Sequence, residues 1–442
     1  MTSPISNTLR AWVFSAEMGY GHHRAVHPLK DIAEDGIMDV RKSGATTPKE
    51  EKQWKRLLGA YEFFSRSLAI PVVGKPLFNI IDGLGHIPSF YPIRDLSGNT
   101  VQVDMLASSI KGGMCKGMLQ TINTKQLPLI TSFYAPAIAA DMAGYHQVYC
   151  IICDADLNRV WVAKEPWESR INYFAPCGKA AQRLKSYGVP EERIFLTGFP
   201  LSDELLGGPD LTILKADLGQ RLHYLDPNNR FWPMHGRSVE HFLGADNCRP
   251  ARQRVLTISY AVGGAGAQKE MGGKIVRSLK KYIQNGELHI NLISGIRKEV
   301  RDYFLKIKEE IAPDSDGIRV LYSPTLQEYF SQFDNIMHET DILWTKPSEL
   351  SFYVGLGIPI IMTPTIGSQE KFNRQWLFEI QAGIKQENPD HADQWLFDWL
   401  SNGRLAEAAW SGFLKARKLG VYKIKEVLET GKMTKSDSPV LR

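Results

Sequence analysis

The sequence predicts an α/β protein made of two doubly wound, Rossmann-like domains. Short apolar runs without alternation recur along the chain, and amphipathic helical patterns separate them. Apolar strands joined by helical crossovers are typical of parallel sheets that are covered on both faces. The chain has 442 residues, which is more than one domain around a single hydrophobic core usually contains, so two domains are expected.

The candidate strands form two series along the chain. The first series covers residues 11–16, 127–133, 147–153, 172–177 and 193–198. The second series covers residues 254–260, 288–295, 318–323, 341–346 and 358–364. Strands of 4–8 apolar residues that alternate with helical segments indicate βαβ units. Each series is therefore expected to form one parallel sheet.

The interruptions between these elements set the domain boundaries. We expect an N-terminal domain over 1–205, in which an aromatic and apolar stretch at about 45–115 breaks the α/β rhythm and forms a helical insertion. Residues 206–250 are rich in Gly, Pro, Asn and Asp and predict a linker that carries an insertion. The second domain is expected over 251–390. Residues 391–442 are predicted to be helical, with a frayed tail in the last dozen positions.

Composition and charge narrow the classes of function. Hydrophobic residues make up 43% and charged residues 23%, which is ordinary for a globular enzyme and excludes a disordered or fibrous protein. The net charge of +5 is mild. It weakly favours anionic ligands or an anionic membrane surface, and it is no signature of nucleic-acid binding.

The five cysteines indicate a reducing compartment, because an odd number scattered through a long chain does not suit a disulfide framework. Cys150 and Cys153 form a C-x-x-C inside an apolar run, but no second pair is spaced to complete a zinc site. No uncharged apolar run approaches the roughly 20 residues of a spanning helix. We therefore expect a cytoplasmic protein that is at most peripheral to the membrane, with no bound metal.

The stretch 57–92 has two interpretations. It is aromatic and apolar with interspersed Arg and Lys, and it contains Gly and Pro breaks at 74–76 and 85–88. It is either a helical insertion packed on the N-terminal domain, or an exposed apolar surface that receives a lipid or touches a bilayer. In the second case the basic residues would meet lipid phosphates.

The first predicted strand leads into "EMGYGHHRAVHPLKDIA", where a helix begins near His22. In an open parallel sheet, ligands bind where strand ends lead into helix N-termini. Gly19 and Gly21 permit close backbone approach, the helix start favours an anion, and a neutral imidazole can take a proton from an attacking hydroxyl. His22 is otherwise a plain helix-capping residue, and His23 and His27 are expected to be bystanders.

A second glycine loop follows the first strand of the second domain. In "GGAGAQ", Gly263, Gly264 and Gly266 precede a predicted helix. The spacing does not match G-x-G-x-x-G, and the Lys-Ser/Thr of a P-loop is missing, which argues against an ATPase. The loop suits a diphosphate seated on backbone N–H groups; the alternative is a tight turn between a strand and a helix.

Residues 341–383 resemble the nucleotide-sugar half of GT-B glycosyltransferases. In that half a strand, a small-residue turn, a helix with an acidic residue, G-x-P, another strand and Q-E-x-x-N follow in order. The matching pieces are Thr345-Lys346, Gly357-Ile358-Pro359, and Gln369-Glu370 with Asn373.

The N-terminal "GYGHHRA" is similar to G-x-G-H-x-x-A of monogalactosyldiacylglycerol synthases, processive diacylglycerol glucosyltransferases and the peptidoglycan lipid-intermediate N-acetylglucosaminyltransferase. Residues 127–202 resemble the same group, with an Asp after a strand, a Trp shortly after it and a closing T-G-x-P. The resemblance implies a GT-B fold, in which two Rossmann-like domains face each other across a cleft. It also implies that the helices of 391–442 cross back to the N-terminal domain.

The resemblance also implies roles for residues in the N-terminal domain. His22, with Gly21, would contact the donor diphosphate or act as the general base. Asp154 is a second candidate for orienting or deprotonating the acceptor hydroxyl.

In the second domain the resemblance implies a nucleotide-sugar site. Gly263, Gly264 and Gly266 would approach the donor phosphates, and the main chain at Tyr322 and Ser323 would read the base edge. Gln369, Glu370 and Asn373 would bond sugar hydroxyls and phosphate, and Lys346 would pair with a phosphate. The family's ribose-binding Glu aligns with Phe352, so Glu349, one turn earlier, is the candidate replacement.

The implied function is that of an inverting hexosyltransferase, which moves a sugar from a UDP-sugar to a hydroxyl of a lipid such as diacylglycerol. The UDP-sugar is a co-substrate, and neither another cofactor nor a protein-bound metal is expected. Two alternatives remain open. One keeps the fold but makes the protein a UDP-sugar 2-epimerase or a transferase with a soluble acceptor; the other is an inactive GT-B binding protein, motivated by the irregular "KPSE" turn at 346–349.

Overall fold

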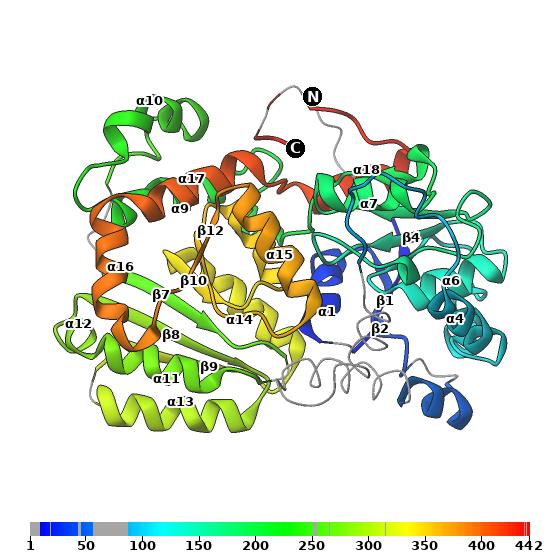
Figure 1. Ribbon diagram of the computed structural model, residues 1–442, viewed down its shortest axis with the longest axis horizontal. Helices are drawn as coiled ribbons and strands as arrows, with labels where there is room; N and C mark the ends of the chain where they lie inside the picture. The colour runs from blue at the N-terminus through cyan, green and yellow to red at the C-terminus, as the bar shows by residue number, and fades with distance from the viewer. Residues whose placement is uncertain are drawn as a thin grey trace.

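The computed structural model describes residues 9–17, 19–42, 46–55, 87–250, 254–264, 266–313, 315–436, 438 and 440–442. These residues form two lobes, each built on a six-stranded parallel sheet (Figure 1). The N-lobe comprises the described residues up to 206 together with the last helix of the chain. The C-lobe comprises residues 254–415, with the segment 212–250 attached. Most of the stretch 57–92 lies outside the described residues.

The N-lobe sheet has the strand order β2-β1-β3-β4-β5-β6, with every neighbouring pair parallel. Its strands are β1 Ala11–Ser15, β2 Ala33–Asp39, β3 Leu129–Thr131, β4 Val148–Ile151, β5 Ile171–Phe174 and β6 Ile194–Phe195. The first predicted series is thus confirmed. Strand β2 was not predicted, because its sequence "AEDGIMD" is largely polar and it forms the half-exposed edge of the sheet.

Helices cover both faces of this sheet. They are α1 Tyr20–Val26, α4 Val101–Lys111, α5 Lys116–Ile122, α6 Tyr134–Met142 and α7 Gly178–Ser186. Within the predicted insertion at 45–115, α4 begins at the N-cap Thr100, whose hydroxyl accepts from the N–H of Val103. This helix packs against α6 through its apolar face.

The C-lobe sheet has the strand order β12-β11-β10-β7-β8-β9, again all parallel. Its strands are β7 Leu256–Ala261, β8 Leu288–Gly295, β9 Ile318–Tyr322, β10 Ile342–Thr345, β11 Ile360–Met362 and β12 Gly383–Lys385. Counted along the chain this is the 3-2-1-4-5-6 order of dinucleotide-binding sheets. Only the short edge strand β12 lies outside the predicted series.

The main C-lobe helices are α11 Lys269–Ser278, α12 Lys280–Gln284, α13 Lys298–Ile311, α14 Leu326–Glu339 and α15 Ser368–Glu379. A buried 3₁₀ segment, η4 Glu349–Leu356, connects β10 to β11. With two Rossmann-like lobes facing each other, the predicted GT-B fold is confirmed.

The predicted linker and insertion at 206–250 is largely helical, although its sequence shows no sustained helical period. It contains α9 Thr212–Leu225 and α10 Trp232–Leu243, after a short helix α8 Asp203–Leu206. Four leucines at helical spacing in α9 are buried: Leu214, Leu218, Leu222 and Leu225.

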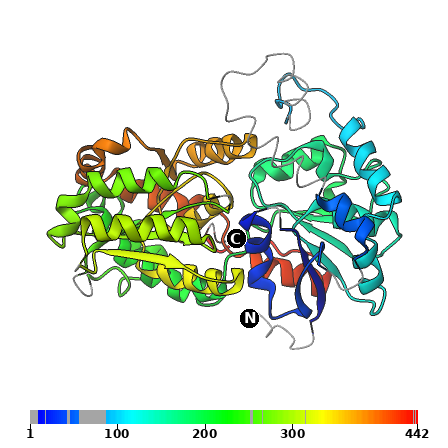
Figure 2. The ribbon, with the colours of Figure 1, turned by 90° about the horizontal axis from the view of Figure 1, so that it is seen from below.

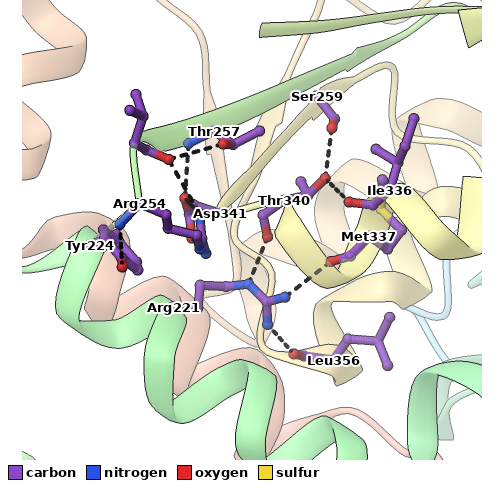
Figure 3. Close-up of polar contacts among 11 residues, drawn as sticks. Arg221, Tyr224, Arg254, Thr257, Ser259, Ile336, Met337, Thr340, Asp341 and Leu356 are labelled. Atoms are coloured by element: carbon purple, nitrogen blue, oxygen red, sulfur yellow. Dashed lines mark hydrogen bonds and ion pairs between the residues drawn. The ribbon is translucent and has the colours of Figure 1, made fainter. Parts of the chain in front are cut away.

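A buried arginine fixes α9 to the C-lobe (Figure 3). Arg221 donates to the carbonyl oxygens of Thr340, Leu356 and Met337 at 2.8, 2.9 and 3.2 Å. Next to it, Arg254 makes a two-pronged ion pair with Asp341, at 2.7 and 2.5 Å. Because α9 is held in this way, the first connection between the lobes is the short segment around Gly207 and Gly208.

The last three helices run from one lobe to the other. They are α16 Ala392–Ser401, α17 Arg404–Lys415 and α18 Gly420–Thr430. Helix α17 packs on η4 and α9, whereas α18 lies against the N-lobe, where Lys425 pairs with Asp31 and Tyr422 donates to Asp203 (Figures 1 and 2). The chain therefore crosses between the lobes twice, near 207–211 and near 416–419.

The predicted frayed tail is wrong for the described residues at the C-terminal end. Val440 is buried, and Lys418 donates from its ammonium group to the carbonyl oxygen of Val440 at 3.0 Å. The backbone N–H of Lys418 donates to the carbonyl of Arg442. These bonds fold the tail back over the second crossing. In the part of the chain that the structure describes, no helix is long and apolar enough to span a membrane.

Candidate functional site

The strand orders locate the candidate site. In an open parallel sheet, a crevice forms at the carboxyl ends of strands where the strand order reverses. In the N-lobe that point lies between β1 and β3, and in the C-lobe between β7 and β10. The loops that follow these four strands carry His22, Ser132, Gly263 and Lys346.

The two glycine loops meet at the interface between the lobes. A Cβ atom at Gly264 would lie 3.2 Å from Cδ1 of Tyr20 and 3.3 Å from its backbone nitrogen. A Cβ at Gly263 would lie 2.5 Å from Cε of Lys346, so a larger residue here would displace the end of the lysine side chain. Gly266 adopts a φ of +71° beside Val300. The loops thus face each other, as the sequence predicts.

His22 is held as a neutral imidazole with one nitrogen available. Its Nδ1 lies 2.6 Å from the carbonyl oxygen of Ser132. Since a carbonyl only accepts, Nδ1 carries the proton and Nε2 is the acceptor. Burial lowers the pKa of His22 to about 4. The ring packs edge-on against Phe133 and near Trp161, which fixes its plane.

Asp154 follows β4 and reaches the C-lobe. Its Oδ1 accepts a hydrogen bond from Nδ2 of Asn373 at 2.8 Å. Burial, with a smaller contribution from the nearby carboxylates of Glu349 and Glu370, raises the pKa of Asp154 to about 6 against the lowering effects of Asn373 and Lys346. A carboxyl group that titrates near neutral pH is suited to general acid or base chemistry.

Asn373 joins the two lobes. It is fully buried on α15, and its Oδ1 accepts from the N–H of Ala155 at 2.7 Å. Its Nδ2 donates to Asp154 and also to the carbonyl of Pro347, at 3.2 Å. Every polar atom of this amide is therefore used, and in this structure Asn373 positions Asp154.

Lys346 and Glu370 form the cationic side of the cluster. Lys346 Nζ lies 2.6 Å from Oε1 of Glu370, and Glu370 Oε2 accepts from the N–H of Ile366 at 2.6 Å. Gln369 is the second residue of α15, immediately before Glu370. The stem of Lys346 crosses Gly263, so its ammonium group lies beside the predicted phosphate loop.

Glu349 faces the N-lobe. Its Oε1 lies 3.5 Å from Nε of Arg24, and its Oε2 would lie 3.3 Å from a Cβ at Gly21. Phe352, which aligns with the family's Glu, is buried and stacks on Phe199 of the N-lobe with ring centroids 5.0 Å apart. Phe352 therefore serves packing between the lobes.

Tyr322 and Ser323 lie apart from the carboxylate cluster, at the end of the edge strand β9. The guanidinium of Arg301 lies 4.7 Å from the ring centroid of Tyr322. Ser323 is fully buried, and its N–H donates to the carbonyl of Gly295. Within the part of the chain that the structure describes, these residues form no hydrogen bond with His22 or Asp154.

Two residues of α1 contribute to the site although they were not predicted. Tyr20 accepts the N–H of Ile296 at 3.1 Å through its hydroxyl, and Arg24 is buried against the C-lobe. Tyr20, Arg24 and His27 follow the i, i+4, i+7 spacing of one helix face. That spacing was visible in the sequence, but the opposing surface was not.

Comparisons with known protein sequences find a matching family model and a related enzyme. A family described as a domain of unknown function, DUF6938, matches residues 295–429. A UDP-N-acetylglucosamine 2-epimerase from Yersinia pestis is 32% identical over 125 residues, a match that spans 24% of this chain and 32% of that protein.

Among solved structures, a putative UDP-N-acetylglucosamine 2-epimerase from Listeria monocytogenes is similar at 10% identity and a TM-score of 0.49, covering 97% of this chain and 99% of that one. Acinetobacter baumannii MurG is similar at 13% identity and a TM-score of 0.46, covering 95% of this chain and 99% of that one.

Proposed function

We propose that this chain is an enzyme that uses a UDP-sugar, and specifically an inverting glycosyltransferase that moves a hexose to a hydroxyl acceptor. One observation carries the proposal. Between the lobes, the carboxyl of Asp154 lies near the Lys346–Glu370 pair, and Lys346 crosses the glycine loop at Gly263. The neutral imidazole of His22 lies near Glu349 at the same interface. The UDP-sugar proteins among the similar structures support the choice of donor.

In the proposed reaction the C-lobe holds the donor diphosphate. Backbone N–H groups of the loop 263–266 and the ammonium group of Lys346 would meet the negative charge that develops on the leaving UDP. Glu370 would then exchange part of its contact with Lys346 for a sugar hydroxyl, and Gln369 would bond a neighbouring hydroxyl. Asn373, whose amide is already fully used, would keep Asp154 in position. Tyr322 and Ser323 would contact the base through the main chain.

Two side chains, Asp154 and His22, are candidates for the base that takes the proton of the acceptor hydroxyl, and their pKa values differ. A proton acceptor works best when its pKa lies near the operating pH. Asp154, at about 6, meets that condition better than His22, at about 4. A difference of about two in pKa corresponds to about 3 kcal/mol in proton affinity. We therefore propose Asp154 as the base and His22 Nε2 as a hydrogen-bond acceptor that orients the hydroxyl or the donor.

A lipid is the proposed acceptor, with the protein peripheral to an anionic membrane surface. The resemblance to lipid glycosyltransferases supports this choice. The N-lobe also carries large apolar side chains that are 61–87% exposed, at Tyr91, Ile93, Val101 and Met105. Such exposure suits contact with acyl chains or a bilayer surface.

Epimerisation of a UDP-sugar at C2 is the second candidate. This reaction needs several acid and base groups around the sugar. Glu349 and Glu370 lie close enough to Asp154 to raise its pKa. The 32% identity to an epimerase over 125 residues also favours it.

Product analysis separates the candidates. The protein is incubated with UDP-glucose, UDP-galactose or UDP-N-acetylglucosamine, with and without diacylglycerol vesicles, and products are identified by mass spectrometry and chromatography. A glycolipid supports transfer to a lipid, and a C2-epimeric nucleotide sugar formed without acceptor supports epimerisation. Calorimetry with UDP is the underlying check: a protein that binds neither UDP nor a UDP-sugar contradicts both.

A further inference from the structure

Helix α1 carries His22 toward one lobe and Arg24 into the other. His22 is anchored on the N-lobe through the carbonyl of Ser132. Arg24, two positions later, points away from that anchor and is only 3% exposed. Helix α1 has seven residues and is attached to the N-lobe through His22 and to the C-lobe through Arg24. The positions of both side chains therefore depend on how the two lobes lie relative to each other.

The surroundings of Arg24 belong to the C-lobe. Its Nη1 and Nη2 donate to the hydroxyls of Tyr353 and Tyr329, each at 3.1 Å. Its guanidinium carbon lies 4.2 Å from the ring centroid of Phe333 and 4.8 Å from that of Phe330. These rings come from α14 and η4, so the cation fills an aromatic box of the opposite lobe.

Glu349 closes the box. Its carboxylate pairs with Nε of Arg24 at 3.5 Å, and its Oε2 lies close enough to Gly21 to be 3.3 Å from a Cβ at that position. One carboxylate therefore lies against α1 both before and after His22. Because a buried guanidinium is costly without its partners, α1 cannot leave this position while Arg24 stays in the box.

We propose that Arg24 is a positioning residue, which binds α1 to the C-lobe. It thereby keeps water away from the His22 imidazole and keeps the imidazole oriented toward the donor loop. The inference rests on the proposed function for its catalytic meaning, but its structural content stands by itself. Without Arg24, α1 loses its hydrogen bonds to Tyr329 of α14 and Tyr353 of η4 and its ion pair with Glu349, and water reaches the imidazole.

The pKa of His22 is a direct measure of whether water reaches its imidazole. The titratable groups that face its ring are His23 on its own helix, Glu349 from η4 and the thiol of Cys153 after β4. In the wild type, burial keeps the imidazole neutral down to about pH 5. In Arg24→Met, which keeps volume but removes charge and donors, the His22 pKa should rise by at least one, toward its ordinary value.

The experiment labels histidine at Cε1 with carbon-13 and follows the His22 signal, assigned with His22→Gln, between pH 5 and 8. Lys179→Met is the matched control, because it removes a different ion pair between the lobes, Lys179–Glu379 at 3.2 Å. Hydrogen exchange at residues 326–339 and 349–356 should rise in Arg24→Met and stay unchanged in Lys179→Met.

An Arg24→Met protein that retains the wild-type His22 titration and the wild-type exchange overturns the proposal. If Arg24→Met does not fold, Arg24→Lys takes its place, and the same rise or its absence decides. With an active wild type, we expect Arg24→Met to lose at least tenfold in kcat with an unchanged Kd for UDP. A wild type without turnover refutes the proposed function, and the titration still decides the role of Arg24.

Discussion

Asp154→Asn should make the protein more stable at pH 8 and no more stable at pH 4. The carboxyl of Asp154 has its pKa raised from 3.8 to about 6, chiefly by burial. In the native state its charged form is thus disfavoured relative to the unfolded chain. The penalty is almost fully present above about pH 6 and largely disappears as the pH falls to about 4, where the native carboxyl is protonated and the unfolded carboxyl is close to its pKa of 3.8.

The magnitude follows from the same two values. An increase of about two in pKa corresponds to about 3 kcal/mol, which is an upper bound for the gain from a neutral side chain. Asparagine keeps an oxygen that accepts the Asn373 amide, at 2.8 Å in the wild type. With about 2–4 °C per kcal/mol for a domain of this size, the midpoint of N-lobe unfolding at pH 8 should rise by several degrees.

Thermal unfolding of the wild type and Asp154→Asn is measured from pH 4 to pH 8. The control is Asp156→Asn, two residues away. Asp156 is paired with the buried guanidinium of Arg183 at 2.7 Å, so its neutralisation leaves a buried cation unpaired and should destabilise the protein by about 3–5 kcal/mol. A gain for Asp154→Asn that is equal at pH 4 and pH 8, or no gain at pH 8, would refute the reasoning.

Three further predictions concern ligand binding, catalysis and the anchor of α9. Lys346→Met should weaken UDP binding in calorimetry by about tenfold, because a desolvated charge contact to phosphate is lost; unchanged affinity would show that the diphosphate binds elsewhere. His22→Gln should lower kcat by about 10²-fold or more with the donor KM little changed, measured by initial rates, and full activity would remove His22 from the mechanism. Arg221→Met should lower the free energy of unfolding by about 2–4 kcal/mol in denaturant titrations, because three buried carbonyls lose their donor, while the Kd for UDP stays constant.

The sequence predicted the central strands because their side chains are buried on both faces. "AWVFSA" and "RVLTISY" contain few polar residues, and they became β1 and β7 at the centres of the two sheets. The edge strand β2 gave no such signal, since its polar sequence "AEDGIMD" packs only on part of its surface, whereas the more apolar edge strands β6 and β9 were predicted. In α9 the leucine spacing was present, but the Gly-, Asn- and Pro-rich residues around it obscured the helix.

The sequence predicted the loops of the candidate site but not the contacts between side chains of the two lobes. Glycine turns after strands, the histidine at a helix start and the Q-E-x-x-N segment are local patterns that a sequence displays. The partners of Arg24, and the contact of Glu349 with Gly21, depend on how two lobes meet. A helix face predicts that something is buried against it but does not identify the opposing surface.

The placement of α18 has a consequence for biosynthesis. This helix completes the N-lobe, yet it leaves the ribosome only after the whole C-lobe has been made. At about 5–20 residues per second, the roughly 200 residues between α8 and α18 take roughly 10–40 s to translate. Throughout that interval the N-lobe surface that receives Val421 and Ile424 stays exposed to solvent. A chaperone that binds apolar surface of nascent chains can bind there until α18 has been made.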